Sequence, residues 1–518
     1  MWGGIGLGTL AVAFALLFDL SRHAVSENSD SATVALEGQA MLHGNVLLNH
    51  WTISLDSFWS IDALFNAVFS GVLGLRAALV NVVPAVIAVL VVALGALVAV
   101  LDSTRSRASC AVPVVATMLL LPGHALSFFF LQGPWHIGTA LWCLIAFLGL
   151  HEGRFNLGWV VAIVFLAAGL LGDVQMLALG VVPVFVAGLA AVGRSRRLRP
   201  GLSLLVASPA AVLLALVIRE IALSLGTFTF KEAHHTAHLA RMEHNLGHLA
   251  AWTLALLGVT PGPFGGPRVP VVVESAHAML VVLVACAGLY ALVLLARGLT
   301  SHGAPDAVHE ARSRMDDLLL FAAVGDLGVF ELLTLSNNVL YARYLTAGVV
   351  FATVLTARMV ARVAERSWSP RLLGPLGVVV GAIVVALCTN VVIELRGPLP
   401  TRPAVALEHY LVEHHLSHGV GDYWAASIVT LDSGGAVTIR PVVANLHHLI
   451  VPDGRQADGS WYRGQRFQFL VFQTLPYGRV DVATVTRTFG MPVHVQRVGQ
   501  YFVATWRHQL ALSGAAFP

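Results

Sequence analysis

The sequence predicts a mainly α-helical fold: a polytopic transmembrane helical bundle of about eleven spans, followed by a C-terminal mixed α/β domain outside the membrane. Hydrophobic residues make up 57% of the 518 residues and charged residues only 11%, with a mean hydropathy of +0.77. Apolar stretches of about 20 residues recur as far as residue 396. After Pro398 the composition changes to short β-branched and aromatic runs that turn residues separate.

Charge and cysteine content exclude several classes of protein. The net charge of +3 is small for 518 residues, so nothing favours a nucleic-acid partner. All of the cysteines lie inside hydrophobic stretches, which predicts neither a disulfide framework nor a thiolate metal site. The apolar N-terminal stretch lacks a basic region and a convincing cleavage site, so we expect it to be retained as the first span.

The expected spans follow from the length of each apolar stretch, because a bilayer core of about 30 Å requires about 20 residues of helix. They are residues 2–20, 77–101, 110–131, 136–151, 156–172, 174–192, 202–224, 271–296, 317–335, 339–361 and 372–394. Two further apolar segments, 60–75 and 245–258, are short and predict interfacial or re-entrant helices.

Arginine placement predicts the orientation of these spans. Arginines cluster in alternate short loops, at 105–107, 194–199, 312–314 and 362–371, and the positive-inside rule makes these loops cytoplasmic. The N-terminus is then cytoplasmic. We therefore expect a transmembrane domain over 1–396 with outer-face loops 21–76 and 225–270, and an exoplasmic α/β domain over 397–518.

The first outer loop carries the residue of most interest, Asp30. It lies among Asn28, Ser29 and Ser31, and this sequence is typical of the N-terminal cap of a short helix. Asp30 is therefore either a capping residue of a surface helix or a carboxylate that acts where the membrane meets water. Glu37 follows on the same expected helix.

Further ionisable residues fall at the same predicted membrane level. Asp173 lies at the hairpin between two spans, His136 borders an outer turn, and Arg343 with Tyr344 opens a late span. The structural alternatives are a turn residue for Asp173 and interfacial snorkelling for Arg343. Carboxylates and an arginine at one level suit the transfer of a lipid-phosphate-linked group to a hydroxyl, since a carboxylate can take the proton and a guanidinium can hold the phosphate.

These residues together resemble the GT-C superfamily of integral-membrane glycosyltransferases, which includes protein O-mannosyltransferases and bacterial lipid-A and arabinan glycosyltransferases. The resemblance covers the first span, Asp30-Ser31-Ala32 leading into residues 37–45, the hairpin Asp173, Arg343-Tyr344-Leu345, and the outer C-terminal domain. The stretch 419–424 with 437–441 is similar to one in uncharacterised bacterial members.

The resemblance implies a polyprenyl-phosphate-linked sugar donor and a glycan, lipid or protein hydroxyl acceptor at the outer face of a bacterial inner membrane. It implies Asp30 as general base and Arg343 as a phosphate contact. Asp173 would support the acceptor or, in metal-using branches, a cation, with Glu37, Tyr344 and His136 beside the substrates. The chain has Asp30-Ser31 where mannosyltransferases commonly have an Asp-Glu pair, which leaves the sugar and the metal open.

The outer segment 231–248 is rich in histidine. His234 with His238, and His244 with His248, are four residues apart and share a helix face, a spacing that can chelate a divalent ion. No glutamate stands between them in the metalloprotease arrangement, so an interfacial polar helix is the alternative. No cofactor is implied with certainty, and a divalent metal ion stays open.

Two other functional classes are compatible with the sequence. A transporter or flippase of lipid-linked sugars would be favoured by Asp326 inside a span, although the chain has no inverted repeat with paired interrupted segments. The other class is a non-catalytic membrane scaffold that presents the C-terminal domain. This class does not explain why Asp30, Asp173 and Arg343 are predicted at the same membrane level.

Overall fold

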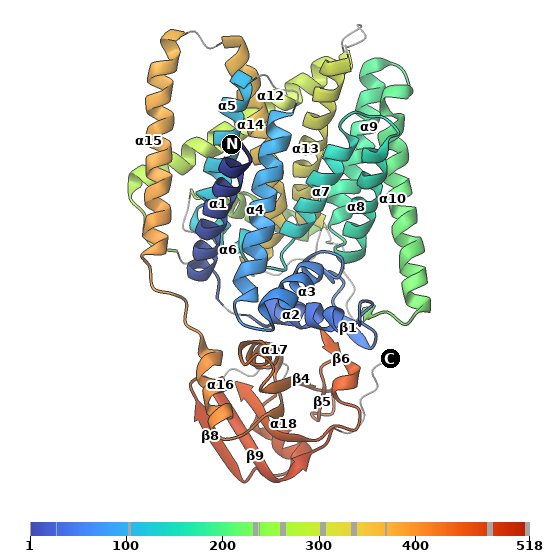
Figure 1. The fold of residues 1–518 in the computed structure, drawn as a ribbon, viewed down its shortest axis with the longest axis vertical. Coiled ribbons are helices and arrows are strands. Elements are labelled where there is room, and N and C mark those ends of the chain that lie inside the picture. Colours follow the sequence, from blue (N-terminus) through green and yellow to red (C-terminus); the bar gives the residue numbers. More distant parts are fainter. Residues whose placement is uncertain are drawn as a thin grey trace. The chain divides into compact units, whose positions relative to one another are not determined.

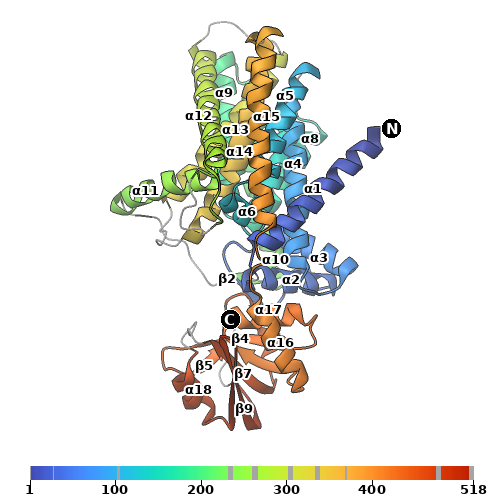
Figure 2. The same cartoon turned by 90° about the vertical axis from the view of Figure 1, so that its left-hand side faces the viewer.

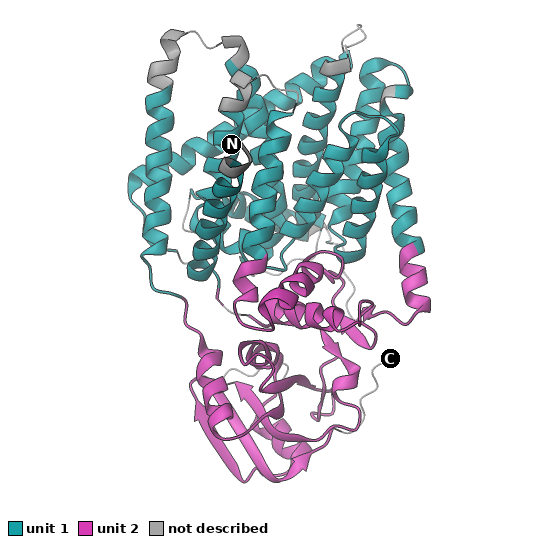
Figure 3. Ribbon diagram, viewed as in Figure 1, with its two compact units in different colours: residues 1–25, 84–217, 234–399 teal, residues 26–83, 218–233, 400–518 magenta. Residues whose placement is uncertain are grey.

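The computed structural model describes residues 2–26, 28–101, 105–230, 237, 239–259, 266–300, 307–332, 339–367, 370–473 and 480–512. The chain forms two compact units, shown in Figure 3. The first unit comprises residues 1–25, 84–217 and 234–399, and the second comprises 26–83, 218–233 and 400–518. Each unit is therefore assembled from segments that lie far apart in the sequence.

The first unit is a helical bundle (Figure 1). Its elements are α1 (Trp2–Ala24), α4 (Leu79–Val100, from residue 84), α5 (Arg105–Leu120), α6 (His124–Phe130), α7 (Ile137–Leu150), α8 (Leu157–Gly172), the π-helix η1 (Leu177–Val181), α9 (Val182–Ser195), α10 (Arg199–Ser224, to residue 217), α11 (Leu239–Leu256), α12 (Val271–Thr300), α13 (Ala307–Leu332), the 3₁₀ helix η3 (Val339–Leu345), α14 (Thr346–Ser367) and α15 (Pro370–Leu395). Figure 2 shows α11 at a large angle to α13 and α14.

The chain is a multi-pass membrane protein, but the expected count of about eleven spans is not confirmed. Within the described residues, seven helices are long and apolar enough to cross a bilayer. The predicted span 110–131 is broken into α5 and α6, which are bent by 87°. The spans predicted at 136–151 and 156–172 are the short apolar helices α7 and α8. The predicted span 317–335 falls on α13, where Asp316, Asp317 and Asp326 reduce the hydropathy.

Burial distinguishes the inner from the outer helices of this bundle. The segment Val339–Ala364, which contains α14, is 89% buried over its most apolar window, whereas the corresponding window of α12 is only 11% buried. Val349, Phe351 and Val354 of α14 lie in the interior. Helix α14 is therefore central, and α12 presents an apolar surface to the surrounding lipid.

The second unit contains α2 (Ser29–Leu42), β1 (Trp51–Ile53), α3 (Asp62–Leu73), β2 (Thr229–Phe230), α16 (Pro403–Glu413), β3 (His418–Gly421), α17 (Tyr423–Asp432), β4 (Thr438–Ala444), β5 (Ile450–Pro452), β6 (Ala457–Asp458), η4 (Gly459–Trp461), β7 (Phe467–Gln473), α18 (Val482–Phe489), β8 (His494–Val498) and β9 (Tyr501–Leu510). Its larger sheet has the order β5-β4-β3-β7-β9-β8, and β3 is parallel to both β4 and β7.

Alternate residues of this sheet face two separate hydrophobic cores. Ile439, Phe469 and Val471 pack with α16 and α17, whereas Leu470 and Phe472 pack with Val485 of α18. Figure 2 shows α16 and α17 on one face of the sheet and α18 on the other. The C-terminal residues therefore form a layered α/β domain, as the sequence predicted.

Segments from the first predicted outer loop belong to the same unit. Strand β1 pairs with β2 and with β6, so residues near 52, 229 and 457 form one small sheet. Ala32 and Ala35 of α2 lie in the core that contains α17. The hydroxyl of Thr33 donates a hydrogen bond of 2.8 Å to that of Ser427 in α17, in a buried position.

Helices α2 and α3 approach most closely at Gly38. A Cβ atom added there would lie 2.6 Å from the backbone nitrogen of Ala67 and 2.6 Å from Cβ of Asn66. Glycine is required at this position because the opposing atoms belong to a helix backbone and cannot rotate away. The position of Asp30, two turns earlier on α2, depends on this contact.

We expect Gly38→Ala to separate α2 from α3 and to destabilise the second unit by about 1–3 kcal/mol. Thermal unfolding of the detergent-solubilised protein measures the effect. The control is Gly71→Ala on α3, where the new Cβ would meet only Leu42 at 3.4 Å. Equal unfolding midpoints for the two variants would contradict close packing at Gly38.

Candidate functional site

The Asp30 carboxylate lies in the first turn of α2 and is half-buried. The side chain of Asn28 caps the helix by accepting a hydrogen bond of 2.8 Å from the backbone nitrogen of Ser31, so Asp30 itself is not the cap. Instead, Oδ1 of Asp30 accepts a hydrogen bond of 2.6 Å from the Tyr423 hydroxyl of α17. Asp30 is thus oriented by a residue of the C-terminal domain.

Tyr423 is held in place at the end of β3, the strand that is parallel to both of its neighbours. Asp422 follows β3 and caps α17 by accepting hydrogen bonds from the backbone nitrogens of Trp424 and Ala425. The Tyr423 ring is buried, and its hydroxyl also contacts Gln456. Burial and the nearby Asp30 carboxylate raise the pKa of the Tyr423 phenol well above its usual value, so the hydroxyl stays protonated and donates.

Glu37 lies two turns after Asp30 on α2 and is only 1% exposed. Neither of its carboxyl oxygens has a hydrogen-bond partner among the described residues. Burial raises the pKa of this carboxyl well above its ordinary value of 4.5. The neutral form is therefore favoured in the folded protein, and Glu37 is a buried acid that no structural contact explains.

We expect Glu37→Gln to raise the stability of the protein near neutral pH. When folding raises the pKa of a carboxyl, the contribution of that group to protein stability is fully present below its pKa in the unfolded chain, 4.5. This contribution is lost as pH rises through the pKa of the folded state. The variant should therefore lose less stability with rising pH than the parent. Unfolding midpoints across a pH series measure this, with Glu413→Gln, which is exposed on α16, as the control. A midpoint for Glu37→Gln that matches the parent at low pH and falls below it as pH rises would show that the carboxylate is needed charged.

In the first unit, Asp173 is fully buried directly after α8. Its Oδ2 atom lies 2.8 Å from Nδ1 of His136 and accepts a hydrogen bond from the Thr139 hydroxyl. Its Oδ1 atom accepts a hydrogen bond of 2.9 Å from the backbone nitrogen of Gln175. Donors to both oxygens hold the carboxylate in one orientation.

Gln175 extends this network to α13 and η3. Its side-chain nitrogen donates to Asp326 and, over 2.8 Å, to the carbonyl oxygen of Tyr344. Asp326 also accepts a hydrogen bond of 2.6 Å from the backbone nitrogen of Gly348. The Tyr344 ring packs against the His136 ring with centroids 4.7 Å apart.

The Arg343 guanidinium lies over aromatic rings beside this network. Its Cζ atom is 5.2 Å from the Tyr344 ring centroid, 5.7 Å from that of Tyr341 and 5.9 Å from that of Trp135. These distances are within cation–π range. The half-buried guanidinium is therefore fixed in place and can present its N–H groups to an anion.

The predicted site residues fall into two groups. His136, Asp173, Arg343 and Tyr344 come together in the first unit, whereas Asp30 and Glu37 share α2 in the second. Sequence reasoning missed Gln175, the hub of the first group. The only signal for it was its position two residues after Asp173 in a predicted hairpin.

The Tyr423 ring packs in the core at 1% exposure. Sequence reasoning also missed the contact of its hydroxyl with Asp30.

The histidine segment shows one pair within the described residues. His244 and His248 lie on α11 with their Nε2 atoms 3.1 Å apart; His244 is exposed and His248 is half-buried. His234 and His238 lie outside the described residues. Within the described part of the chain, no group of three or more histidine, cysteine or acidic side chains could hold a metal ion.

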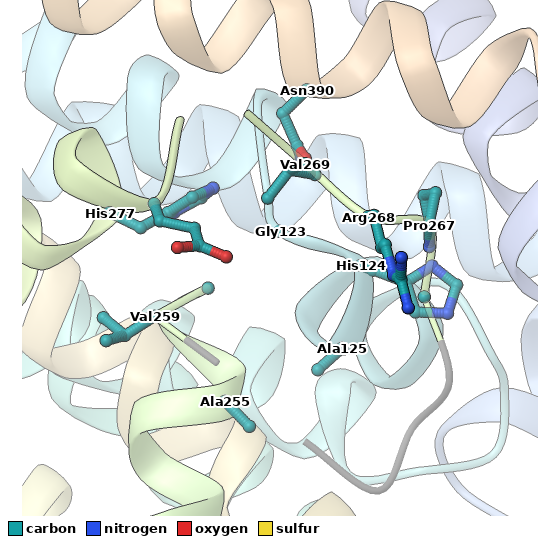
Figure 4. A pocket seen from close by; sticks show the side chains of 13 residues that line it. Gly123, His124, Ala125, Ala255, Val259, Pro267, Arg268, Val269, His277 and Asn390 are labelled. Carbon is teal, nitrogen blue, oxygen red and sulfur yellow. The ribbon is translucent and has the colours of Figure 1, made fainter. Parts of the chain in front are cut away.

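One cavity of about 310 Å³ opens in the first unit between α6, α11, α12 and α15. Figure 4 shows His277 and His124 on opposite sides of it. His124 contacts Glu394 through Nδ1 over 3.0 Å, and the Asn390 side chain donates to the carbonyl oxygen of Pro122. Residues 260–265 lie outside the described residues, and no role is assigned to this cavity.

The fold is that of a multi-pass membrane protein with an α/β domain. Its candidate site residues form two groups, one around Asp173 and one around Asp30. No family model and no curated protein matches the chain.

Among solved structures, the chain is similar to an oligosaccharyltransferase of Archaeoglobus fulgidus. The form with Zn and sulfate is 12% identical over 90% of this chain and 67% of that chain, with a TM-score of 0.48. The apo form is 12% identical over 90% and 69%, with a TM-score of 0.47. The complex of this archaeal enzyme, AglB, with an inhibitory peptide and a dolichol-phosphate is 11% identical over 90% and 69%, with a TM-score of 0.45. Likenesses at this level establish neither a shared family nor a shared activity.

Proposed function

We propose that the protein is a membrane glycosyltransferase of the GT-C type. It transfers a sugar from a polyprenyl-phosphate donor to a hydroxyl of a glycan, lipid or protein at the outer face of the membrane. The hydrogen bond between Tyr423 and Asp30 carries the proposal, because a residue 393 positions later in the chain gives a half-buried carboxylate a fixed orientation. A surface helix needs no such contact, since Asn28 already caps α2.

The proposed reaction is a single displacement at the anomeric carbon. Asp30 accepts the proton of the acceptor hydroxyl while the hydroxyl oxygen bonds to that carbon. The bond from the anomeric carbon to the phosphate oxygen breaks at the same time, and polyprenyl phosphate leaves with the bonding electron pair. Attack from the opposite face inverts the anomeric centre.

Arg343 is proposed to hold the leaving phosphate. Its guanidinium stays charged at all physiological pH values and can donate two parallel hydrogen bonds to phosphate oxygens. The His136–Asp173–Gln175 network supports this role by fixing Tyr344, whose ring lies against that guanidinium. His136, Asp173 and Tyr344 are then positioning residues, and Glu37 is proposed to lie beside the acceptor.

We expect Asp30→Asn to reduce sugar transfer by roughly a hundredfold to ten-thousandfold, the usual contribution of a general base. Asparagine can still accept the Tyr423 hydrogen bond, so the fold should persist. The assay is release of polyprenyl phosphate from a panel of polyprenyl-phosphate-linked sugars by the purified protein. Glu413→Gln on the exposed face of α16 is the matched control. An unchanged rate for Asp30→Asn would remove Asp30 from the mechanism.

We expect Arg343→Gln to lower kcat/KM by roughly a hundredfold or more, since the charge that develops on the leaving phosphate loses its partner. Arg343→Lys keeps the charge but loses the bidentate donors, and should recover only part of the rate. Arg268→Gln removes an exposed charge near the start of α12 and is the control. An effect on KM alone would show that Arg343 binds the donor without stabilising the transition state.

A transporter of lipid-linked sugars is the second candidate, and one observation favours it. Helices α5 and α6 are bent by 87° at a short break, as in a broken span or a re-entrant loop, and broken helices are typical of transporter binding sites. Asp326, however, is bonded to Gln175 and Gly348 and connects helices. Movement of an intact lipid-linked sugar across reconstituted vesicles, without release of polyprenyl phosphate, would favour the transporter.

A further inference from the structure

A second cavity, of about 210 Å³, lies in the first unit between α9, α12, α13 and α14. It is at the opposite end of the bundle from the Asp173 network, because Asp173 precedes α9 and Arg194 lies in the last turn of that helix. The cavity is lined by Arg194, Arg297, Arg362, Asp316 and Asp317 together with apolar residues of α12. Nothing in the proposed transfer reaction uses it.

The two aspartates of this cavity are already paired. Asp317 forms an ion pair with Arg194, and both side chains are at least nine-tenths buried. Asp316 accepts a hydrogen bond of 2.6 Å from Nε of Arg358 and another from Arg362. Arg358 also donates to the carbonyl oxygen of Val98 over 2.7 Å. These pairs hold α9, α13, α14 and α4 together.

Arg297 is different. It lies exposed in the last turn of α12, and its guanidinium makes no hydrogen bond or ion pair with the described residues. The cavity wall therefore carries three cations, Arg194, Arg297 and Arg362, against two anions, Asp316 and Asp317. Asp316 is also shared with Arg358, so positive charge is in excess at this wall, and an anionic group would reduce that excess.

The remaining wall is apolar and continues along a lipid-facing helix. Apart from Gly298 and Ser313, it consists of Ala291, Leu294 and Leu295 of α12, the helix whose most apolar window is only 11% buried. The lining thus combines cationic side chains with apolar residues of a helix that is largely exposed and suited to face lipid. This combination matches the shape and polarity of a phospholipid, and a soluble anion would not use the apolar part.

Gly298 lets the buried cation reach the cavity. A Cβ atom at this position would lie 2.6 Å from Cδ of Arg194, so any larger residue would push the arginine away from its place across α12. Glycine at position 298 is therefore required for Arg194 to keep its position across α12.

We propose that this cavity binds the phosphodiester headgroup of an anionic phospholipid, with its acyl chains along α12. Guanidinium groups bind phosphate oxygens bidentately, and basic pockets between transmembrane helices are typical lipid-headgroup sites. Arg196, Arg197 and Arg312 belong to the same arginine-rich end, which the positive-inside rule assigns to the cytoplasmic leaflet. The site is distinct from the proposed transfer site.

The test uses the full-length protein in nanodiscs of phosphatidylcholine with or without phosphatidylglycerol, and native mass spectrometry measures the lipid retained. We expect phosphatidylglycerol to be retained in preference, and Arg297→Gln to weaken that preference about fivefold, the contribution of one arginine near a headgroup. Arg197→Gln is the matched control, because it removes an exposed charge from the same end without lining the cavity. The Arg197→Gln variant should retain as much phosphatidylglycerol as the parent protein.

A second variant distinguishes a lipid from a free anion. Leu294→Trp should fill the apolar wall without changing charge, and we expect it to lower phosphatidylglycerol retention as Arg297→Gln does. The proposal would be overturned if Leu294→Trp left phosphatidylglycerol retention unchanged and added inorganic phosphate abolished it, because that result would indicate a free-phosphate site. Equal losses for Arg197→Gln and Arg297→Gln, or no preference for phosphatidylglycerol, would also overturn it. Polyprenyl phosphate release in the same samples reports separately on the transfer activity.

Discussion

The hydrogen bonds of Gln175 hold together the part of the helical unit on which the candidate site depends. Within a bilayer, a buried polar group finds no water, so each must be bonded within the protein. The backbone nitrogen of Gln175 donates to Asp173, and its side-chain amide donates to Asp326 and to the Tyr344 carbonyl. The corner after α8, the C-terminal part of α13 and the end of η3 are thereby fixed. Arg343 is adjacent to Tyr344, so its place over three aromatic rings follows from the same bonds.

Two buried carboxyl groups in the second unit, those of Asp422 and Glu37, differ in the hydrogen bonds that they accept. The Asp422 carboxyl accepts hydrogen bonds from the start of α17 and from Gln473, yet burial still raises its pKa to about 6. All of these bonds go to Oδ1, and capping of α17 explains why a carboxyl stands at this position. Glu37 is equally buried, but within the described residues it has no donor. A protein retains such a group only at a cost in stability, which is why Glu37 and not Asp422 is assigned to the site.

The sequence determines the individual elements better than their assembly. Hydropathy located the long apolar helices, and turn residues located the β-rich C-terminal domain, because both signals are local. The span count was not confirmed, since α7 and α8 are only 14 and 16 residues long and α13 carries several carboxylates. The contact between Asp30 and Tyr423 joins residues 393 positions apart, and no periodic pattern encodes such a distance. His136 and Asp173 were expected at one membrane level, but their direct contact required the packing of α7 on α8.

Helix α13 explains why the two ends of the bundle can serve different purposes. Near one end Asp316 and Asp317 bind arginines of α14 and α9, and further along Asp326 binds Gln175 and the backbone of Gly348. Each carboxylate uses a partner from a different segment, so the polar contacts are distributed along the helix and do not merge into one network. About nine residues of helix separate the two groups, which corresponds to roughly 14 Å along the axis. Loss of the charge on Arg297 can therefore change lipid binding at one end without disturbing His136, Asp173 and Arg343 at the other.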